Sequence, residues 1–471
     1  MTNQANLQVL SLGIPLFNTH NPLPSTTLSP APGEWDPKRL FYHTTRISAS
    51  IARHELYALQ VGDAWARTIP VLALAPDALL LGFGSVVRVH PLHAADFAHR
   101  RVGEPVAVDV SAGDIAKRSG AGSGADIVGI HALPAPSGTD FVVAQFDGSV
   151  QRYTRGRSAA HYPHPGGVHS LTGWREMVLS VSGAGGSASI SGSRRTASAF
   201  SSAASTPGSA NVPSARLFSA TSPWIPPSEL TLPGRAWSAH LSSRGAFFGL
   251  RGGIHRHDAS SGLSDQGDIF LPVSEEVSRS AAYGLATFPT TSGSPLASTL
   301  LSAWHDGTAR VHDLRTRRQV MALTDPWSDS ALFSAAFVGP HGVIAGGAEH
   351  GIVNVWDVRY ATAHTGWSVF SPHGRGSPVY DLAGDGGRVW GVTERRAFVL
   401  AFDDAEVGCP GDPGGELRRR GSATKEVPTG WRPRGGRVGW TVHYGEHALK
   451  ETVMGYRHGE GGMSLFESRV R

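Results

Sequence analysis

Short stretches of alternating apolar and polar residues, separated by turns, run through most of the chain. In the second half, a turn is repeatedly followed by such a stretch, which ends in an aromatic residue or His and then Asp. The clearest copies run from Thr308 to Arg315 and from Ile352 to Arg359. Alternation with a period of two, bounded by turns that contain Gly, predicts β-strands, and its recurrence predicts a repeat architecture.

The copies follow one another at a regular step. Asp357 comes 44 residues after Asp313, and Asp403 closes the next copy 46 residues later. Asp258 comes 55 residues before Asp313, which leaves room for one longer loop. The seven copies that fit the pattern are residues 84–90, 147–153, 215–219, 253–258, 308–315, 352–359 and 397–403.

Each clear copy is preceded by two apolar strand candidates, so the copy is the third strand of a four-stranded unit. Seven such units predict an all-β fold, a seven-bladed β-propeller over residues 54–403. Strands buried on both faces read as apolar runs with small residues, and the 58 Gly in the chain suit such a structure. We expect residues 56–61 to close the ring, because an open sheet edge invites aggregation.

Three segments are expected outside the blades. Residues 182–214 are nearly all Ser, Gly, Ala and Thr, which predicts a disordered insertion between the second and third strands of the third blade. Residues 1–53 are expected to form an extended lead-in rich in Pro and Ser. Residues 404–471 are expected to form a partly disordered tail rich in Gly and Arg, with one more strand from Trp440 to Tyr444.

Five residues of the repeats are expected to have structural roles. A Trp before the Asp can pack its indole between two blades, while the Asp accepts backbone N–H bonds in the turn that follows. The five residues are Asp258, Asp313, Trp356, Asp357 and Asp403.

Composition limits the classes of partner. The formal net charge is only +4 and the basic residues are scattered, so neither a nucleic-acid groove nor a membrane surface is indicated. Cys409 is the single cysteine, which excludes an intrachain disulfide and indicates a reducing, intracellular compartment, cytoplasmic or nuclear. No signal peptide or membrane span is predicted, because the most apolar stretch is broken by Pro70, Pro76 and Asp77.

The sequence lacks the usual signatures of catalysis and cofactor binding. None of the four lysines is followed by Ser or Thr, which excludes a Walker phosphate loop, and neither G-x-S-x-G nor H-E-x-x-H occurs. His161, His164 and His169 have metal-like spacing but are expected to be exposed imidazoles in a loop rich in Pro and Gly. His255 and His257 are expected to form hydrogen bonds within the propeller. We therefore predict no catalytic residue, metal ligand or cofactor.

Other proteins are the expected partners of what we expect to be a monomeric propeller. The wider rim of the ring, made up of the loops that enter each blade and those between second and third strands, is the expected binding surface. The candidate contact residues are Phe146, His305, Asp325, Trp327, His350 and Ser377. The alternative is an enzyme framed by the propeller, which needs an acid, a base or a metal site at the channel mouth.

The stretch from Tyr283 to Asp403 resembles WD-repeat proteins, and within them the C-terminal repeats of the dactylin-type F-box and WD-repeat proteins. The residues that carry this resemblance are Pro326, Asp329-Ser330, Leu332-Phe333, Gly351-Ile352-Val353, Trp356-Asp357 and Ser377-Pro378-Val379-Tyr380. The resemblance implies a propeller that holds a substrate for a cullin ubiquitin ligase, which an F-box ahead of it joins. No F-box signature is detected in residues 1–53, where Leu23-Pro24 is followed by Ser25-Thr26-Thr27.

A second route to a ligase starts from the segment that ends in Arg359. Trp356-Asp357-Val358-Arg359 matches the WD-x-R motif of receptors that dock on the damage-binding adaptor of another cullin class, and His312-Asp313-Leu314-Arg315 is an imperfect copy. In those receptors the Arg projects from the bottom of the propeller, which makes Arg315 and Arg359 candidate docking residues. The alternative is an Arg in a surface ion pair. The main hypothesis is a non-catalytic protein-interaction scaffold, with a ubiquitin-ligase substrate receptor as its specific form.

Overall fold

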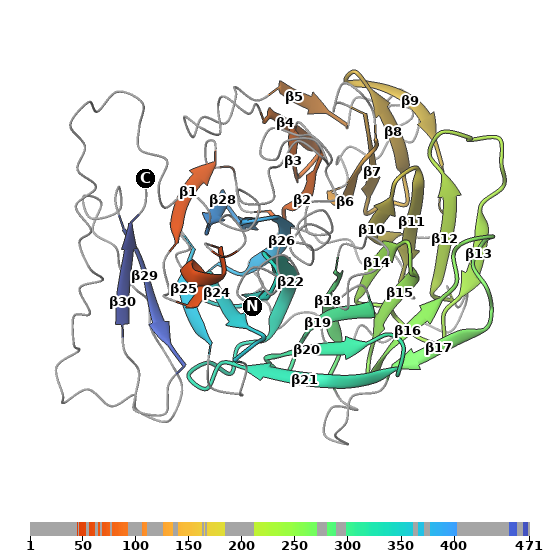
Figure 1. Ribbon diagram of the computed structural model, residues 1–471. Helices are drawn as coiled ribbons and strands as arrows, with labels where there is room; N and C mark the ends of the chain where they lie inside the picture. Colours follow the sequence, from red (N-terminus) through yellow and green to blue (C-terminus); the bar gives the residue numbers. More distant parts are fainter. Residues whose placement is uncertain are drawn as a thin grey trace, which may run out of the picture.

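In the computed structural model, the described residues contain thirty β-strands, which form seven antiparallel sheets around a central axis (Figure 1). The structure describes residues 45–92, 106–110, 126–134, 140–183, 212–270, 280–288, 298–371, 377–402, 452–458 and 465–469, with short gaps inside the first, fourth and seventh ranges. No helix among these residues is long and apolar enough to cross a membrane.

The first four blades follow the chain order. Blade 1 contains β2 (Val71–Leu74), β3 (Ala78–Phe83), β4 (Val86–Pro91) and β5 (Val106–Asp109). Blade 2 contains β6 (Ile127–Ala132), β7 (Phe141–Gln145), β8 (Val150–Thr154) and β9 (Arg157–His161). Blade 3 contains β10 (Val168–Trp174), β11 (Met177–Ser182), β12 (Ser214–Ser219) and β13 (Ser228–Thr231). Blade 4 contains β14 (Ser238–Ser242), β15 (Gly245–Leu250), β16 (Gly253–His257) and β17 (Gly267–Phe270).

Blade 5 also follows the chain order, whereas blades 6 and 7 include strands from the C-terminal and N-terminal ends of the chain, respectively. Blade 5 contains β18 (Ala282–Thr287), β19 (Thr299–Trp304), β20 (Thr308–Asp313) and β21 (Arg318–Thr324). Blade 6 contains β22 (Leu332–Val338), β23 (Gly342–Gly347), β24 (Ile352–Asp357), β25 (Trp367–Phe370), β29 (Thr452–Arg457) and β30 (Leu465–Arg469). Blade 7 contains β26 (Val379–Asp385), β27 (Arg388–Thr393), β28 (Ala397–Ala401) and β1 (Tyr57–Val61).

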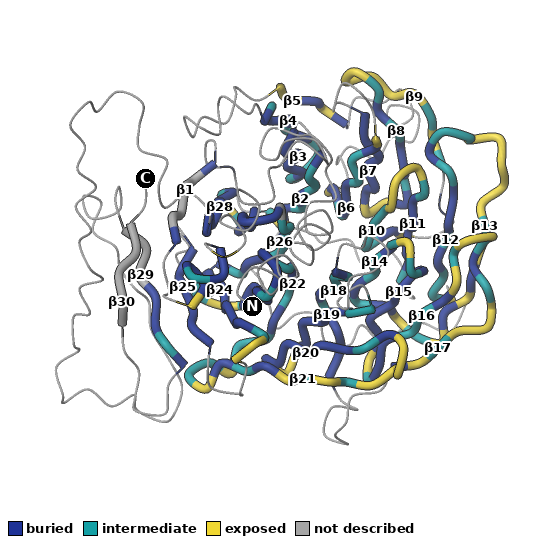
Figure 2. The backbone as a smooth tube through the Cα atoms, viewed as in Figure 1, coloured by how far each residue is buried: buried dark blue, intermediate teal, exposed yellow. Residues whose placement is uncertain are grey.

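The predicted seven-bladed propeller is confirmed. Each of the seven segments chosen from the repeat pattern overlaps the third strand of its blade, and the weak copies at residues 84–90, 147–153 and 215–219 each miss only one residue of that strand. Strands such as β24 and β27 are buried along their whole length, as the apolar runs predicted (Figure 2). Exposed residues gather instead on the outer strands and turns, for example between β12 and β13 (Figure 2).

The ring is closed by the strand that the sequence indicated. Tyr57 to Val61 form β1, which pairs antiparallel with β28 from Ala401 to Ala397. The chain therefore supplies three strands of blade 7 from its C-terminal part and the fourth from its N-terminal part. Because this pairing joins the two ends of the repeat region, opening the ring requires its hydrogen bonds to break.

Blade faces pack directly on one another through apolar side chains. One buried cluster joins Leu301 and Val311 of blade 5 to Leu332 and Trp356 of blade 6. The indole of Trp356, expected to pack between two blades, is fully buried in this cluster. Glycines in the inner strands let neighbouring backbones approach closely. A Cβ on Gly284 of β18 would lie 2.8 Å from Cα of Ser334 in β22.

Two features of the chain ends differ from the expected lead-in and tail. Residues 47–52 are helical rather than extended. Ile47 and Ile51 of this helix pack with Val338 and Trp367, and the indole Nε1 of Trp367 donates a hydrogen bond to the Ile51 carbonyl at 3.0 Å. These contacts with blade 6 explain the helix, because they bury two apolar side chains one turn apart.

The second difference is a C-terminal hairpin, β29–β30, which adds two strands to the outer edge of blade 6 (Figure 1). The expected extra strand from Trp440 to Tyr444 lies outside the described residues, as does Asp403. The insertion joins β11 to β12, the second and third strands of blade 3, as predicted, although residues 184–211 are not described.

Candidate functional site

Strand order divides the loops of the propeller between two faces. Successive strands of a blade are antiparallel, so the turns between second and third strands share one end with the loops that lead into the first strands. We call this the entry face. The six candidate contact residues all belong to entry-face loops. Arg315 and Arg359 follow third strands and therefore lie on the opposite face.

A β-bulge recurs at the entry-face end of the first strand in five of the seven blades, and it redirects one side chain in each of them. The register shifts between Ala282 and Gly284 in β18, between Leu332 and Ser334 in β22, and between Val379 and Asp381 in β26. A bulge adds one residue to the strand and redirects its side chain. The residues added in this way are Tyr283, Phe333 and Tyr380.

Blades 2 and 3 repeat this bulge with other side chains, and blade 4 places a residue at the equivalent position without a register shift. Val128 and His169 occupy the bulge positions of β6 and β10. In blade 4, the backbone N–H of Trp237 donates to the Gly249 carbonyl at 2.7 Å, while Ser238, the next residue, is the register partner of Gly249. Trp237 therefore corresponds to Tyr283 of the next blade.

The rings of blades 4 to 7 touch one another in a continuous row. The centroid distances are 5.2 Å from Trp237 to Tyr283, 5.4 Å from Tyr283 to Phe333 and 6.2 Å from Phe333 to Tyr380. We call these four residues the aromatic arc. All four are half-buried, so each ring keeps part of its surface accessible. Because the first strands surround the central axis of the ring (Figure 1), the arc lies near this axis on the entry face.

Two seryl hydrogen bonds fix the spacing of the arc. The hydroxyl of Ser238 donates to the carbonyl of Ala282 at 2.7 Å, and that of Ser334 donates to the carbonyl of Val379 at 3.0 Å. Each bond links the first strand of one blade to that of the next, one residue away from an arc side chain. The arc is therefore positioned by hydrogen bonds between the first strands of adjacent blades rather than by flexible loops.

A cationic group borders the arc at its blade 4 end. The guanidinium carbon of Arg235 lies 4.2 Å from the ring centroid of Trp237, a cation–π contact. Burial raises the pKa of Tyr283, and the charge of Arg235 opposes that rise. Burial also raises the pKa of Tyr380, to which the nearby Glu394 contributes. Both phenols are therefore protonated hydrogen-bond donors at neutral pH.

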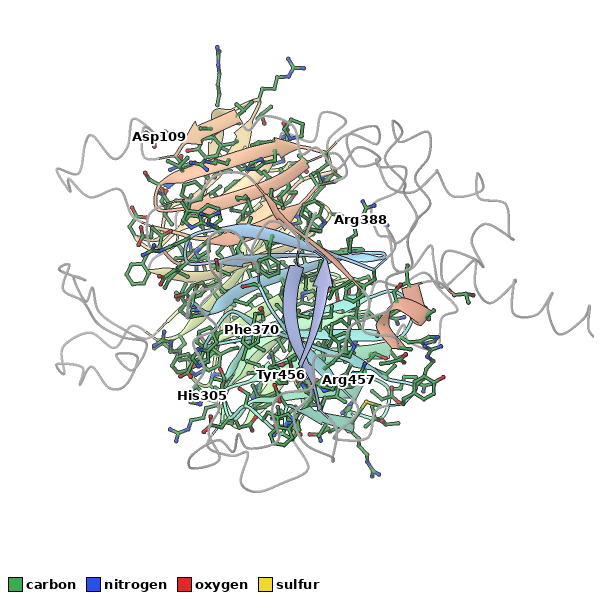
Figure 3. All side chains as sticks on the ribbon, turned by 90° about the vertical axis from the view of Figure 1, so that its left-hand side faces the viewer. Asp109, His305, Phe370, Arg388, Tyr456 and Arg457 are labelled. Carbon is green, nitrogen blue, oxygen red and sulfur yellow. The ribbon has the colours of Figure 1, made fainter. Side chains whose placement is uncertain are left out.

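Of the candidate contact residues, His305 lies against the arc. Its imidazole is 5.6 Å from the ring of Tyr283, and the residue is exposed (Figure 3). Phe146, in the corresponding turn of blade 2, leaves 44% of its surface exposed. His350 is half-buried in the turn of blade 6, with a left-handed backbone at φ 60° and Glu349 at 3.7 Å. These three remain available to a partner.

Asp325 and Ser377 are buried, which corrects their expected role as contact residues. The Ser377 hydroxyl donates to the Pro378 carbonyl at 2.9 Å and accepts from the backbone N–H of Glu394 at 2.8 Å. Both bonds hold together the loops at the entry to blade 7. Ser377 therefore serves the fold, because its buried hydroxyl already forms two internal hydrogen bonds.

Asp325 anchors the C-terminal hairpin. One of its carboxylate oxygens, Oδ2, accepts hydrogen bonds from the hydroxyls of Tyr456 and Ser368. The Ser368 hydroxyl also lies 2.7 Å from Nε2 of His458, and Tyr456 packs beside Phe370 (Figure 3). We call Asp325, Ser368, Tyr456 and His458 the tail clasp. Its Ser, His and Asp are fully buried and Asp325 contacts the same ring nitrogen as Ser368, so the group does not have the geometry of a catalytic triad.

Trp327 completes the loop between blades 5 and 6. Its backbone N–H donates to Oδ1 of Asp325 at 2.9 Å, so the loop is tied to the tail clasp. The residue is half-buried, and its indole Nε1 is buried without a hydrogen-bond partner among the described residues. Part of the Trp327 surface therefore stays accessible, although its polar atom does not.

On the opposite face, Asp residues cap the turns after the third strands. The carboxylates of Asp258, Asp313 and Asp357 each accept the backbone N–H two residues later, at 3.0 Å in all three cases. Arg359 forms two bonds to Asp357, one of them at 2.6 Å, and Arg315 reaches Asp313 at 3.3 Å. Each candidate docking Arg thus already has an internal carboxylate, but Arg315 remains 73% exposed.

The histidine cluster of blades 2 and 3 is not the exposed group that we expected. His161 is exposed, but His164 is buried and His169 is half-buried. Burial lowers the pKa of His169 to about 4, and the positive charges of Arg235 and His164 act in the same direction. In blade 4, Nδ1 of His257 pairs with the Ser264 carbonyl at 2.7 Å. Among the described residues, no three His, Cys, Asp or Glu side chains form a metal-binding group.

The aromatic arc was not predicted, although the sequence carries a signal for it. Ala282-Tyr283-Gly284, Leu332-Phe333-Ser334 and Val379-Tyr380-Asp381 share an apolar residue, an aromatic residue and a small or polar one at the start of a first strand. The aromatic residues are 50 and 47 positions apart, close to the repeat length. Aligning first strands as well as third strands would have shown them.

Comparison with known proteins yields a structural similarity only. The chain matches no protein-family model and no curated protein. Among solved structures, it is similar to the computationally designed Ika8 protein, with a TM-score of 0.43 and 12% sequence identity, over 73% of this chain and 98% of that one. A similarity of this size carries no argument about function, so the site rests on the geometry described above.

Proposed function

We propose that this chain is a non-catalytic protein-interaction scaffold of the WD-repeat type, which holds a partner protein at the aromatic arc. The supporting observation is the repeated bulge that brings Tyr283, Phe333 and Tyr380 into one half-buried row with Trp237 on the entry face. Large, rigid aromatic side chains are the usual anchors of protein interfaces. The side chains that gather there are rings rather than an acid and a base, which supports a binding role.

The specific form of this proposal is a substrate receptor for a cullin ubiquitin ligase. The arc would hold the substrate, and the opposite face, with Arg315, would be free for an adaptor. The resemblance of Tyr283 to Asp403 to dactylin-type repeats supports this form. Both Arg315 and Arg359 pair with an Asp two residues earlier, but the side chain of Arg315 is the more exposed of the two. Arg315 is therefore the favoured adaptor contact.

The test is recovery of partners from cells that express the full chain. Tyr283 touches Trp237, Phe333 and His305, so Tyr283→Ala removes the centre of the arc. Tyr360→Ala is the matched control, because Tyr360 is 62% exposed on the opposite face. We expect mass spectrometry to show a stable partner that Tyr283→Ala loses and Tyr360→Ala retains. Equal recovery with both variants would contradict binding at the arc.

The same experiment addresses the ligase. We expect cullin subunits or their adaptor among the recovered proteins, and we expect Arg315→Ala to reduce them while Tyr283→Ala does not. Consistent absence of ligase components, with another partner present, would leave the general scaffold and remove the ligase.

A further inference from the structure

The width of the aromatic arc suits a narrow ligand. It is one ring wide, and neighbouring rings lie 5.2 to 6.2 Å apart at their centroids. An α-helix has a diameter of about 10 Å with its side chains, so it needs a broad groove rather than a single row of rings. A ligand that follows the arc is therefore an extended chain.

The bulges oppose pairing by a β-strand at this place. A strand that binds by sheet extension needs a regular edge of unpaired N–H and C=O groups. Each of β18, β22 and β26 has its register shift at the arc residue, where a bulge disrupts the ladder. Moreover, the arc crosses from one blade to the next, whereas an added strand would run along a single blade.

A polyproline II helix suits both observations. It is a narrow extended helix with a rise of about 3.1 Å per residue and no internal hydrogen bonds, so its carbonyls remain free to accept. Aromatic-lined grooves bind it by packing rings against proline rings, and its rigidity lowers the entropy lost on binding. In the arc, three phenyl or phenol rings and one indole supply the packing surface. Tyr283 and Tyr380 supply hydroxyl donors, and neither hydroxyl has a partner among the described residues.

We propose that the aromatic arc binds a proline-rich segment of another protein in the polyproline II conformation. This inference rests on the proposed function, because it names the ligand of the same site. Tyr283 has the central position, since its ring touches Trp237, Phe333 and His305. Arg235, stacked on Trp237, places a cation at one end of the arc and favours an acidic residue beside the prolines.

The test is calorimetric titration of the full chain with a peptide of ten prolines, and with a Gly/Ser peptide of the same length as control. We expect the proline peptide to bind and the control peptide not to bind. Tyr283→Ala should weaken binding by a factor of about ten or more, the loss typical of an interface anchor. Tyr283→Phe, which keeps the ring and removes the donor, should weaken it less. Tyr360→Ala should leave it unchanged.

The outcomes separate this inference from the proposed function. No binding of the proline peptide, or equal binding by the wild type and Tyr283→Ala, overturns the ligand class. If Tyr283→Ala still loses a protein partner from cells in that case, the arc remains a protein-binding site for another kind of segment. If the partner is retained as well, both proposals fail. Circular dichroism of each variant establishes that a lost signal does not come from unfolding.

Discussion

Asp325 illustrates how one residue on an entry-face loop can serve the fold instead of a partner. Its position in the loop that enters blade 6 suggested a contact residue, yet its carboxylate is buried and accepts bonds from Tyr456, Ser368 and the backbone of Trp327. Burying a carboxylate is costly unless hydrogen bonds compensate. The three donors offset this cost, and one of them, the Tyr456 hydroxyl, comes from the C-terminal hairpin.

Tyr456→Phe tests that explanation. The variant keeps the buried ring but removes one donor to Asp325, so the carboxylate loses part of its compensation. We expect the free energy of unfolding to fall by about 1–3 kcal/mol, as measured by urea denaturation. Tyr360→Phe is the matched control, because Tyr360 is 62% exposed, and its stability should be unchanged. Equal stability of Tyr456→Phe and the wild type would show that the hairpin is not docked through this bond.

The strands differ in how far the sequence alone could predict them. The third strands and the closing strand β1 were predictable, because local turns, alternation and a regular step mark them. The hairpin β29–β30 was not, since its place depends on contacts such as Tyr456 with Asp325, which are 131 residues apart. The aromatic arc leaves a weaker sequence signal, an aromatic residue at the start of three first strands. Each ring looks like one more buried aromatic residue until the blades are placed side by side.

First strands depend on glycine where two blades approach. A Cβ on Gly284 would lie 2.8 Å from Cα of Ser334 and 3.0 Å from the carbonyl oxygen of Phe333, both backbone atoms of the next blade. These atoms cannot move aside as a side chain can. Gly284→Ala must therefore push β18 away from β22, between two residues of the arc.

We expect Gly284→Ala to lower the free energy of unfolding by about 1–3 kcal/mol, the usual cost of overpacking. Gly234→Ala is the control, since a Cβ there meets no atom within 4 Å. That variant should stay within about 0.5 kcal/mol of the wild type. Thermal and urea denaturation measure both. A neutral Gly284→Ala would mean that the blades are more loosely packed than described.

Across the whole molecule, buried histidines make stability depend on pH. Burial lowers the pKa of His240 and of His312 to about 4, from an ordinary value of 6.5. Nε2 of His240 accepts the backbone N–H of Thr287 at 3.2 Å, so a proton on that nitrogen would break an inter-blade bond. His131 is shifted in the same direction by burial. These groups are neutral in the folded state at pH values where an unfolded chain is protonated.

Asp381 acts in the opposite direction. It links blade 7 to blade 1 by accepting the backbone N–H of Leu72 at 3.1 Å, and burial raises its pKa to about 6. A carboxyl that binds its proton more tightly in the folded state adds stability as pH falls from about 6 towards 4. The shifted histidines lower the free energy of unfolding over nearly the same pH range, as pH falls from 6.5 to about 4. At pH 5 each strongly shifted His lowers the free energy of unfolding by about 2 kcal/mol, whereas Asp381 raises it by about 1 kcal/mol. The effect of the histidines is therefore the larger one.

We therefore expect the free energy of unfolding to decrease as pH is lowered from 7.5 to 5. The unfolded state takes up more protons than the folded state in this window, which is the condition for stability to rise with pH. His240→Gln should reduce the decrease, because the Gln carbonyl can accept the Thr287 N–H and does not titrate. Asp381→Asn should enlarge it, because the opposing carboxyl is removed. Urea denaturation at several pH values measures both slopes. A stability that is flat or rises towards pH 5 in the wild type would mean that these imidazoles take up protons without leaving the folded state.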